Sequence, residues 1–168
     1  MSRGVISLQM FPWMLRAIFI IGVLITLILF INAHLNAVIT IFTSESSTIT
    51  TRILHHPGIM VTDTLLQTTN AGIVDAAACV KFTNNDLEKA ITYDTPSFAG
   101  MFTVKDGSRT VCSATFNKKR YDILRVQLDA GGPFRKAVYE KNATLPILIQ
   151  EGTTQTAGTI EIIILREA

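Results

Sequence analysis

The chain has 168 residues, which is enough for one small domain and one membrane segment. Its net charge is only +2. Residues 1–43 contain Arg3 and Arg16 and no acid, whereas the other 13 of the 15 Lys and Arg residues balance the 13 acids in residues 44–168. A nucleic-acid-binding domain would need a net basic face, so this balance argues against a nucleic-acid partner.

The first feature along the chain is a long apolar segment. Residues 17–31 carry no charge, and Thr26 is their only hydrogen-bonding side chain. A bilayer core needs about 20 apolar residues in a helix, so residues 17–36 are predicted to span a membrane and residues 17–42 to form this helix with its extension. A buried helix of a soluble domain is the alternative, and it is disfavoured because continuous apolar character on all faces of a helix this long is costly in water. A cleaved secretory signal would have a shorter apolar run and a small-residue cleavage pattern.

Polar and aromatic residues mark the two ends of the predicted span. Trp13 and Arg16 precede it, where an interfacial aromatic ring and a snorkelling base are expected. Asn32, His34 and Asn36 follow near the far interface, where water would satisfy them. Placed deeper in the bilayer, these side chains would instead seek partners on neighbouring helices.

The flanking charge predicts the orientation. Two bases precede the span and the next base after it is Arg52, so the positive-inside rule places residues 1–16 in the cytoplasm as a tail and the C-terminal domain outside the cell membrane. Residues 43–51 (TSESSTITT) are expected to be a linker, although their β-branched residues also permit a first strand. Residues 52–168 are expected to form the extracytoplasmic domain.

The first half of this outer domain shows strand and turn patterns. Residues 52–64 predict a strand, a His-Pro-Gly turn and a second strand, and residues 73–82 (IVDAAACVKF) fit either a strand or a short helix. Residues 83–93 predict a short helix capped by Asn84 or Asn85.

Two hairpins are predicted in the second half. Residues 98–104 and 109–116 flank an Asp-Gly pair, which favours a tight hairpin turn, and residues 121–128 fit a strand or a short helix. Residues 145–150 and 159–166 lie around a Thr- and Gly-rich loop and predict the closing hairpin.

The final strand is apolar on most of both faces, which is typical of a central strand. Ile160, Ile162 and Ile164 would lie on one face. The predicted fold class is therefore α+β, with one N-terminal transmembrane helix and a small, mainly-β, sandwich-like extracytoplasmic domain.

Two cysteines, Cys79 and Cys112, are the only ones in the chain. In an oxidising compartment two cysteines most simply form one disulfide, and we favour that pairing. The alternative is two buried free thiols that act as small hydrophobic side chains.

The sequence offers no convincing catalytic or metal-binding constellation. His55, His56 and Asp63 are the best metal candidates, but adjacent side chains on a strand point to opposite faces, and a surface turn before Pro57 is the better interpretation. The chain contains no phosphate-binding loop, nucleophile elbow or zinc-protease motif. We therefore expect no enzyme activity, no metal and no cofactor.

One modification motif is present. Asn142-Ala143-Thr144 matches the N-glycosylation sequon and lies in the segment placed on the exported side. Asn142 is therefore a glycosylation candidate.

The N-terminal tip, Arg3-Gly4-Val5-Ile6-Ser7-Leu8-Gln9, resembles the class III signal of archaeal type IV pilin-like proteins, in which a basic and a small residue precede a long hydrophobic helix. The chain departs from that pattern at Gln9, where Glu is common, and at Pro12 and Arg16, which interrupt the helix.

A second resemblance extends over most of the chain. The chain is similar to a group of archaeal single-pass membrane proteins with a β-rich extracytoplasmic domain. The segments that carry this resemblance are Pro-Trp-Met-Leu-Arg before the apolar helix, residues 52–54, 72–75 and 87–93, and the closing strand pair in residues 145–165. This resemblance implies an accessory component of a pilus-like or surface assembly.

These features together predict a non-enzymatic, membrane-anchored structural component of a cell-surface assembly, either pilin-like or pilus-associated. Its partners would be the lipid bilayer and other subunits, bound through the transmembrane helix and the β-domain, in an oligomer or larger complex. The alternative is an accessory scaffold subunit of a multi-subunit membrane enzyme or transporter. In that case Asn32, His34 and Asn36 would contact other spans.

Overall fold

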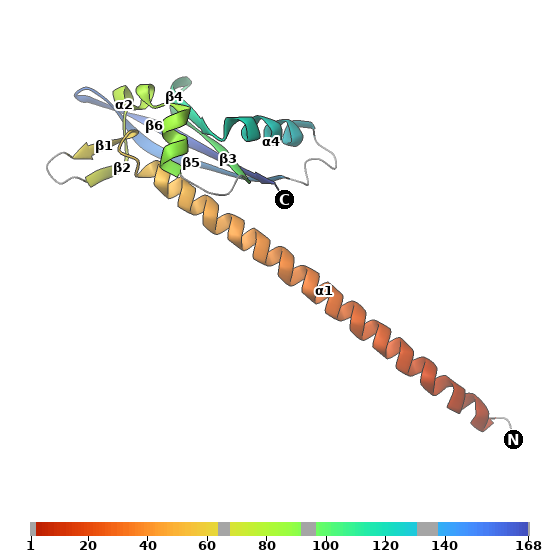
Figure 1. Ribbon diagram of the computed structural model, residues 1–168. Coiled ribbons are helices and arrows are strands. Elements are labelled where there is room, and N and C mark those ends of the chain that lie inside the picture. The colour runs from red at the N-terminus through yellow and green to blue at the C-terminus, as the bar shows by residue number, and fades with distance from the viewer. Residues whose placement is uncertain (1–2, 64–67, 92–96, 131–137, 168) are drawn as a thin grey trace. The chain divides into compact units, whose positions relative to one another are not determined.

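The computed structural model describes residues 3–63, 68–91, 97–130 and 138–167, with side chains from residue 11 onward. The chain divides into two compact units, Met1–Thr43 and Ser44–Ala168, which are described separately below. The expected α+β class is confirmed: a long apolar N-terminal helix precedes a six-stranded mixed sheet with short helices (Figure 1).

Helix α1 (Arg3–Leu54) is longer than the sequence predicts, because residues 43–51 are helical and do not form the expected linker. Its hydroxyl side chains explain why a Ser- and Thr-rich segment stays helical. Thr48, Thr50 and Thr51 each donate to the carbonyl oxygen four residues earlier, at 2.8–3.1 Å. These hydroxyls are thereby satisfied within the helix and do not compete with its backbone hydrogen bonds.

The last turns of α1 belong to the second unit. Ser46, Ile49 and Ile53 are buried there, and their spacing of three and four residues places them on one helical face. The helix ends before Pro57, because proline disfavours helical geometry in the residue that precedes it. Residues 52–54, expected as a strand, are the final turn of this helix.

The second unit contains one sheet with strand order β1-β2-β5-β6-β3-β4. The outer strands β1 (Met60–Asp63) and β2 (Thr68–Asp75) are antiparallel, and β2 runs parallel to β5. The remaining neighbours are all antiparallel.

The predicted closing hairpin is present and its strands are longer than expected. Strands β5 (Val138–Glu151) and β6 (Thr154–Glu167) pair along their full lengths around a two-residue turn in which Gly152 has a φ of 62°. Strand β6 lies between β5 and β3, as its two apolar faces predict. Ile160, Ile162 and Ile164 are all buried.

The other predicted hairpin, in residues 98–116, is also confirmed. Strands β3 (Phe98–Asp106) and β4 (Arg109–Phe116) join at Gly107, whose φ is 57°. At Gly100 the backbone of β3 is closely covered: a Cβ atom there would lie 2.5 Å from the Phe116 ring and 2.7 Å from the carbonyl oxygen of Ile163. Only glycine fits this position without rearrangement.

Short helices connect β2 to β3. Asp75 caps α2 (Ala76–Lys81) by accepting hydrogen bonds from the amides of Ala77 and Ala78 at 2.9 and 3.1 Å. The predicted helix in residues 83–93 is α3 (Asn84–Ile91). Its cap is Thr83, and the predicted Asn84 instead accepts the Thr115 amide of β4 at 2.8 Å.

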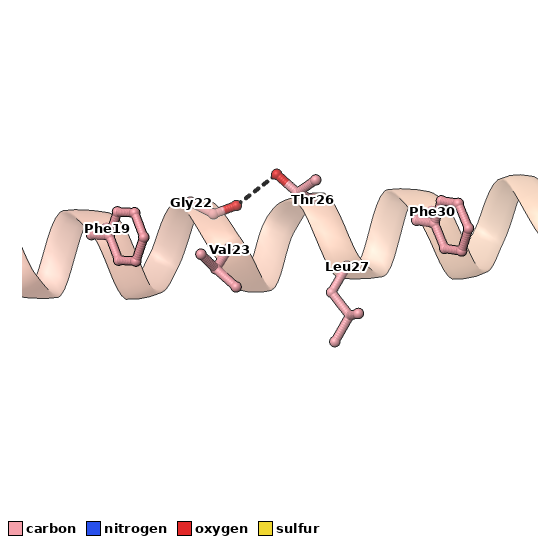
Figure 2. A pocket seen from close by; sticks show the side chains of 6 residues that line it. All are labelled: Phe19, Gly22, Val23, Thr26, Leu27 and Phe30. Atoms are coloured by element: carbon pink, nitrogen blue, oxygen red, sulfur yellow. Dashed lines mark hydrogen bonds between the residues drawn. The ribbon is translucent and has the colours of Figure 1, made fainter.

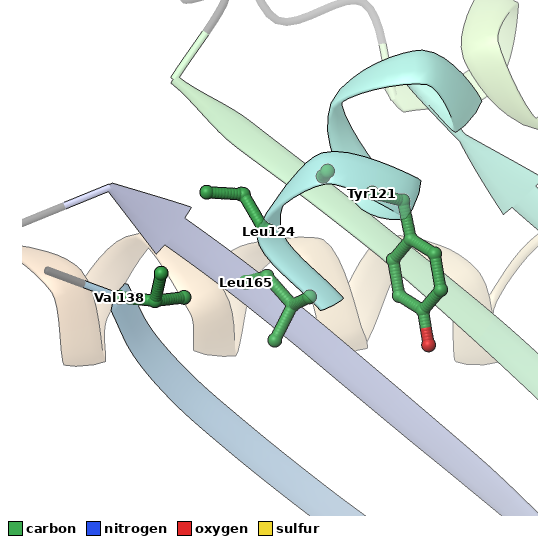
Figure 3. Packing of buried hydrophobic residues seen from close by; sticks show 5 residues of the cluster. Tyr121, Leu124, Val138 and Leu165 are labelled. Atoms are coloured by element: carbon green, nitrogen blue, oxygen red, sulfur yellow. The ribbon is translucent and has the colours of Figure 1, made fainter. Parts of the chain in front are cut away.

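The helices supply the layers that a sandwich-like domain would take from a second sheet. On one face, the Phe82 ring lies 6.1 Å from the Phe102 ring of β3, which brings the α2–α3 connection over that strand. On the other face lies α4 (Lys118–Ala130), in the segment where a strand or a helix was expected. Figure 3 shows part of its contact with the sheet, a cluster that consists of Ala99, Tyr121, Leu124, Val138 and Leu165.

Candidate functional site

The exposed surface of α1 is the first candidate site. The helix carries a segment, Phe11–Leu54, that is long and apolar enough to cross a membrane. The large apolar side chains of its first part are about half exposed or more, for example Phe19 at 72% and Ile28 at 64%. Apolar surface on every side of a helix is unfavourable in water, so this segment has the character of a membrane anchor or a signal.

Trp13 and Arg16 lie one turn apart at the start of this segment. The guanidinium carbon of Arg16 is 6.0 Å from the centre of the Trp13 ring, within the range of a cation–π contact. Pro12 lies inside the helix immediately before them. The structure thus brings together the two residues that the sequence predicts at one membrane interface.

The polar residues predicted at the far interface lie in α1 as well. Asn32, His34 and Asn36 are all exposed. Asn32 and Asn36 are one turn apart and share a face, whereas His34 lies on the opposite side of the helix. The carbonyl oxygen of Asn36 accepts a hydrogen bond from the Thr40 hydroxyl at 2.8 Å.

A shallow hollow lies between two aromatic side chains of α1. Gly22 forms its floor, and a Cβ atom at this residue would have nothing within 4 Å. The Thr26 hydroxyl donates to the carbonyl oxygen of Gly22 at 2.9 Å, so it is satisfied inside the helix (Figure 2). The lining residues are Phe19, Gly22, Val23, Thr26, Leu27 and Phe30.

This Gly22 hollow is a feature that the sequence interpretation missed. The signal was present, because Gly22 and Thr26 have the four-residue spacing of small residues that lets two helices approach closely. The sequence interpretation treats Thr26 only as the polar exception in an apolar run.

The two cysteines form the expected disulfide. Cys79 of α2 is bonded to Cys112 of β4, with their Cα atoms 5.9 Å apart. Both side chains are buried. The bond ties a helix to the strand at one edge of the sheet, and it occupies both thiols.

The histidine pair has local structural contacts. His55 Nδ1 lies 2.9 Å from the carbonyl oxygen of Thr51, and His56 Nδ1 accepts the Gly58 amide at 3.0 Å. The His56 ring also makes an edge contact with Phe82. Among the residues that the structure describes, no group of three His, Cys, Asp or Glu side chains is placed to hold a metal ion.

The environment of His56 alters its protonation. Partial burial lowers the pKa of its imidazole, and the negative charge of Asp86 opposes this effect. The Asp86 carboxylate accepts hydrogen bonds from the hydroxyl and amide of Thr83 at 2.7 and 3.0 Å, which lower the pKa of Asp86. The Thr83 hydroxyl oxygen in turn accepts the Asp86 amide at 3.3 Å, which completes the capping box of α3.

The sequon lies in the middle of β5. Asn142 is exposed, and its side-chain nitrogen donates to Glu140 Oε1 at 3.1 Å. Thr144, the other residue that defines the motif, is exposed two positions further along the strand.

Comparison with protein families, curated proteins and solved structures finds no match to this chain.

Proposed function

We propose that this protein is a non-enzymatic, membrane-anchored structural subunit of a cell-surface assembly, pilin-like or pilus-associated. The observation that carries the proposal is the exposed apolar surface of α1, which a bilayer would cover. Arg3 and Arg16 favour a cytoplasmic N-terminus, and the disulfide favours an oxidising compartment for the second unit. The N-terminal resemblance to pilin-like proteins supports the finer assignment.

The means of assembly would be helix packing at the Gly22 hollow. Lipid tails are as apolar as leucine side chains, so helices associate in membranes where small residues permit close van der Waals contact. Gly22 and Thr26 offer such a surface, and Phe19 and Phe30 flank it. The bonded cysteines and the local contacts of His56 support a structural rather than a catalytic role for these side chains.

A first experiment tests the anchor. Membranes prepared from cells that make the full chain should retain it after alkaline carbonate washing, and protease added from outside should digest the second unit while it spares residues 1–16. A chain released by the wash, or a second unit protected from external protease, would contradict this arrangement.

A second experiment tests the assembly. Gly22→Leu fills the hollow. Ala17→Leu adds a side chain of similar size about 140–150° around the helix axis from Gly22, so it serves as the matched control. In mild detergent, the wild-type chain and Ala17→Leu should elute as a complex and crosslink to other subunits, and Gly22→Leu should lose this association. A monomeric wild-type chain that copurifies with no filament or surface complex would overturn the proposal.

The alternative function is an accessory scaffold subunit of a multi-subunit membrane enzyme or transporter. It is favoured by the exposed polar groups of Asn32, His34 and Asn36, which would find partners on other spans if they lie within the bilayer. A stable, stoichiometric complex with polytopic proteins that is lost in Asn32→Leu, but kept in Gly22→Leu, would select this alternative.

A further inference from the structure

The outward face of strand β5 carries the only N-glycosylation sequon in the chain. Side chains two residues apart on a strand share a face, so Asn142 and Thr144 point to the same side of the sheet. Both are exposed, whereas Ala143 between them lies on the other face and is half-buried. The two groups that define the sequon are therefore presented together to solvent.

The surface around Asn142 has room for a sugar. Every second residue of β5 on this face is exposed from Glu140 to Leu148. Helix α4 covers the same face elsewhere, where it packs on Val138, Ala99 and Leu165. A glycan on Asn142 would begin beside α4 and extend over the exposed part of β5.

The hydrogen bond of Asn142 is compatible with modification. Its side-chain nitrogen donates to Glu140 Oε1 at 3.1 Å, and the same oxygen lies 3.4 Å from the Arg125 guanidinium of α4. An N-linked asparagine keeps one N–H on its side-chain nitrogen. That N–H can still donate to Glu140, so the folded arrangement survives attachment of the sugar.

We propose that Asn142 is N-glycosylated and that the glycan covers the exposed face of β5. The side-chain nitrogen of Asn142 attacks the anomeric carbon of a lipid-linked oligosaccharide. A nitrogen–carbon bond forms, the bond from that carbon to the lipid phosphate oxygen breaks, and the lipid phosphate leaves while the nitrogen loses one proton. The inference rests on the proposed function in one respect, namely the exported position of the second unit.

The structure also indicates when the sugar is added. Asn142 pairs with Ile163 of β6 and Thr144 pairs with Glu161, so the backbone of the sequon lies within the β5–β6 ladder. A transferase cannot bind that backbone from the β6 side once the hairpin has closed. Modification during export, before the hairpin closes, would leave this backbone accessible from both sides.

The test measures the intact mass of the full chain, purified from cells that glycosylate their other exported proteins. The wild-type chain should exceed its 18.5 kDa sequence mass by the mass of an oligosaccharide. Asn142→Gln and Thr144→Ala should remove this excess. Thr144→Ser keeps the hydroxyl group and should retain it. A wild-type chain at its sequence mass would overturn the inference.

A matched control separates this inference from the proposed topology. Gly152→Asn, combined with Asn142→Gln, places a sequon with Thr154 in the exposed β5–β6 turn, where asparagine tolerates the positive φ. If this variant carries sugar and the wild-type chain does not, the exported topology stands and glycosylation of Asn142 is wrong. If neither carries sugar and external protease spares the second unit, both proposals are wrong.

Discussion

The guanidinium of Arg52, in the last turn of α1, donates a hydrogen bond to the carbonyl oxygen of Ile91 at the end of α3, over 3.0 Å. This bond joins residues 39 positions apart. It satisfies a carbonyl at a helix C-terminus, where no intrahelical partner remains. With Ile49 and Ile53 buried beside it, the end of α1 is an integral part of the core of the second unit.

The first prediction concerns this helix end. Ile53 is only 2% exposed, so Ile53→Ala should lower the free energy of unfolding of the second unit by about 2–5 kcal/mol, because it leaves a cavity in the core. Thr48 is exposed on the same helix, and Thr48→Ala should change this free energy by less than about 0.5 kcal/mol. Urea unfolding of the full chain in detergent, followed by the near-UV circular dichroism of its three tyrosines, would measure both. Equal effects would mean that residues 44–54 do not belong to the core.

The helix end also shows where sequence reasoning failed. The composition of residues 43–51 is that of a linker, with four Thr, three Ser, one Glu and a single apolar residue, Ile49. The helical signal is the spacing of Ser46, Ile49 and Ile53, and one of these positions is polar. Only tertiary contacts show that this face is buried.

Local signals succeeded where the chain turns sharply. The Asp-Gly pair predicted the β3–β4 turn, and the apolar residues on most of both faces of residues 159–166 predicted a central strand. The N-terminal part of β5 was missed because its outward residues are polar and exposed. The parallel pairing of β2 with β5 joins Ile73 to Leu148, a contact between residues far apart in the chain that no local pattern encodes.

The candidate site was predicted in part. The positions of Trp13 and Arg16 follow from the edges of the apolar run, and the disulfide follows from the cysteine count and the expected compartment. The Gly22 hollow needed attention to small residues inside an apolar segment, where hydropathy alone shows nothing distinctive.

The second prediction concerns the disulfide. Cys79 and Cys112 are 33 residues apart, and closing a loop of this length should stabilise the second unit by about 3–4 kcal/mol in the chain-entropy model. The Cys79→Ala and Cys112→Ala double variant should unfold at a correspondingly lower urea concentration. Reductant should shift the wild-type midpoint in the same direction and leave the double variant unchanged. Two thiols that react in the unreduced, unfolded wild-type chain would show that the bond is absent.

The third prediction compares neighbours on α4. Leu124 packs in the cluster with Leu165 (Figure 3) and is 2% exposed. Its neighbour Ile123 is 58% exposed. Leu124→Ala should cost about 2–5 kcal/mol of unfolding free energy, and Ile123→Ala less than about 0.5 kcal/mol. The same urea titration measures both. A large loss at Ile123 would show that α4 presents a different face to the sheet.

The fourth prediction concerns pH. Burial lowers the pKa of His56 in the folded state below its unfolded value of about 6.5. Below pH 7 the unfolded chain therefore binds more protons at this residue, so the second unit should lose stability as the pH falls from 7 to 5. His56→Asn should reduce this slope, because asparagine does not titrate but can still accept the Gly58 amide.

The control for this pH effect is the adjacent histidine. His55→Asn makes the same substitution at an exposed side chain. This variant should keep the loss of stability between pH 7 and 5 that the wild-type chain shows. Asp86 does not contribute to the slope between pH 5 and 8, because hydrogen bonds from Thr83 lower the pKa of its carboxyl group. The stability that Asp86 contributes is lost only as the pH falls through this lowered pKa, which lies below the measured range. Urea midpoints at pH 5, 6, 7 and 8 for the two variants and the wild-type chain would decide the point. If the slope persists in His56→Asn and disappears in His55→Asn, the assignment of the pH dependence to the partly buried imidazole of His56 is wrong.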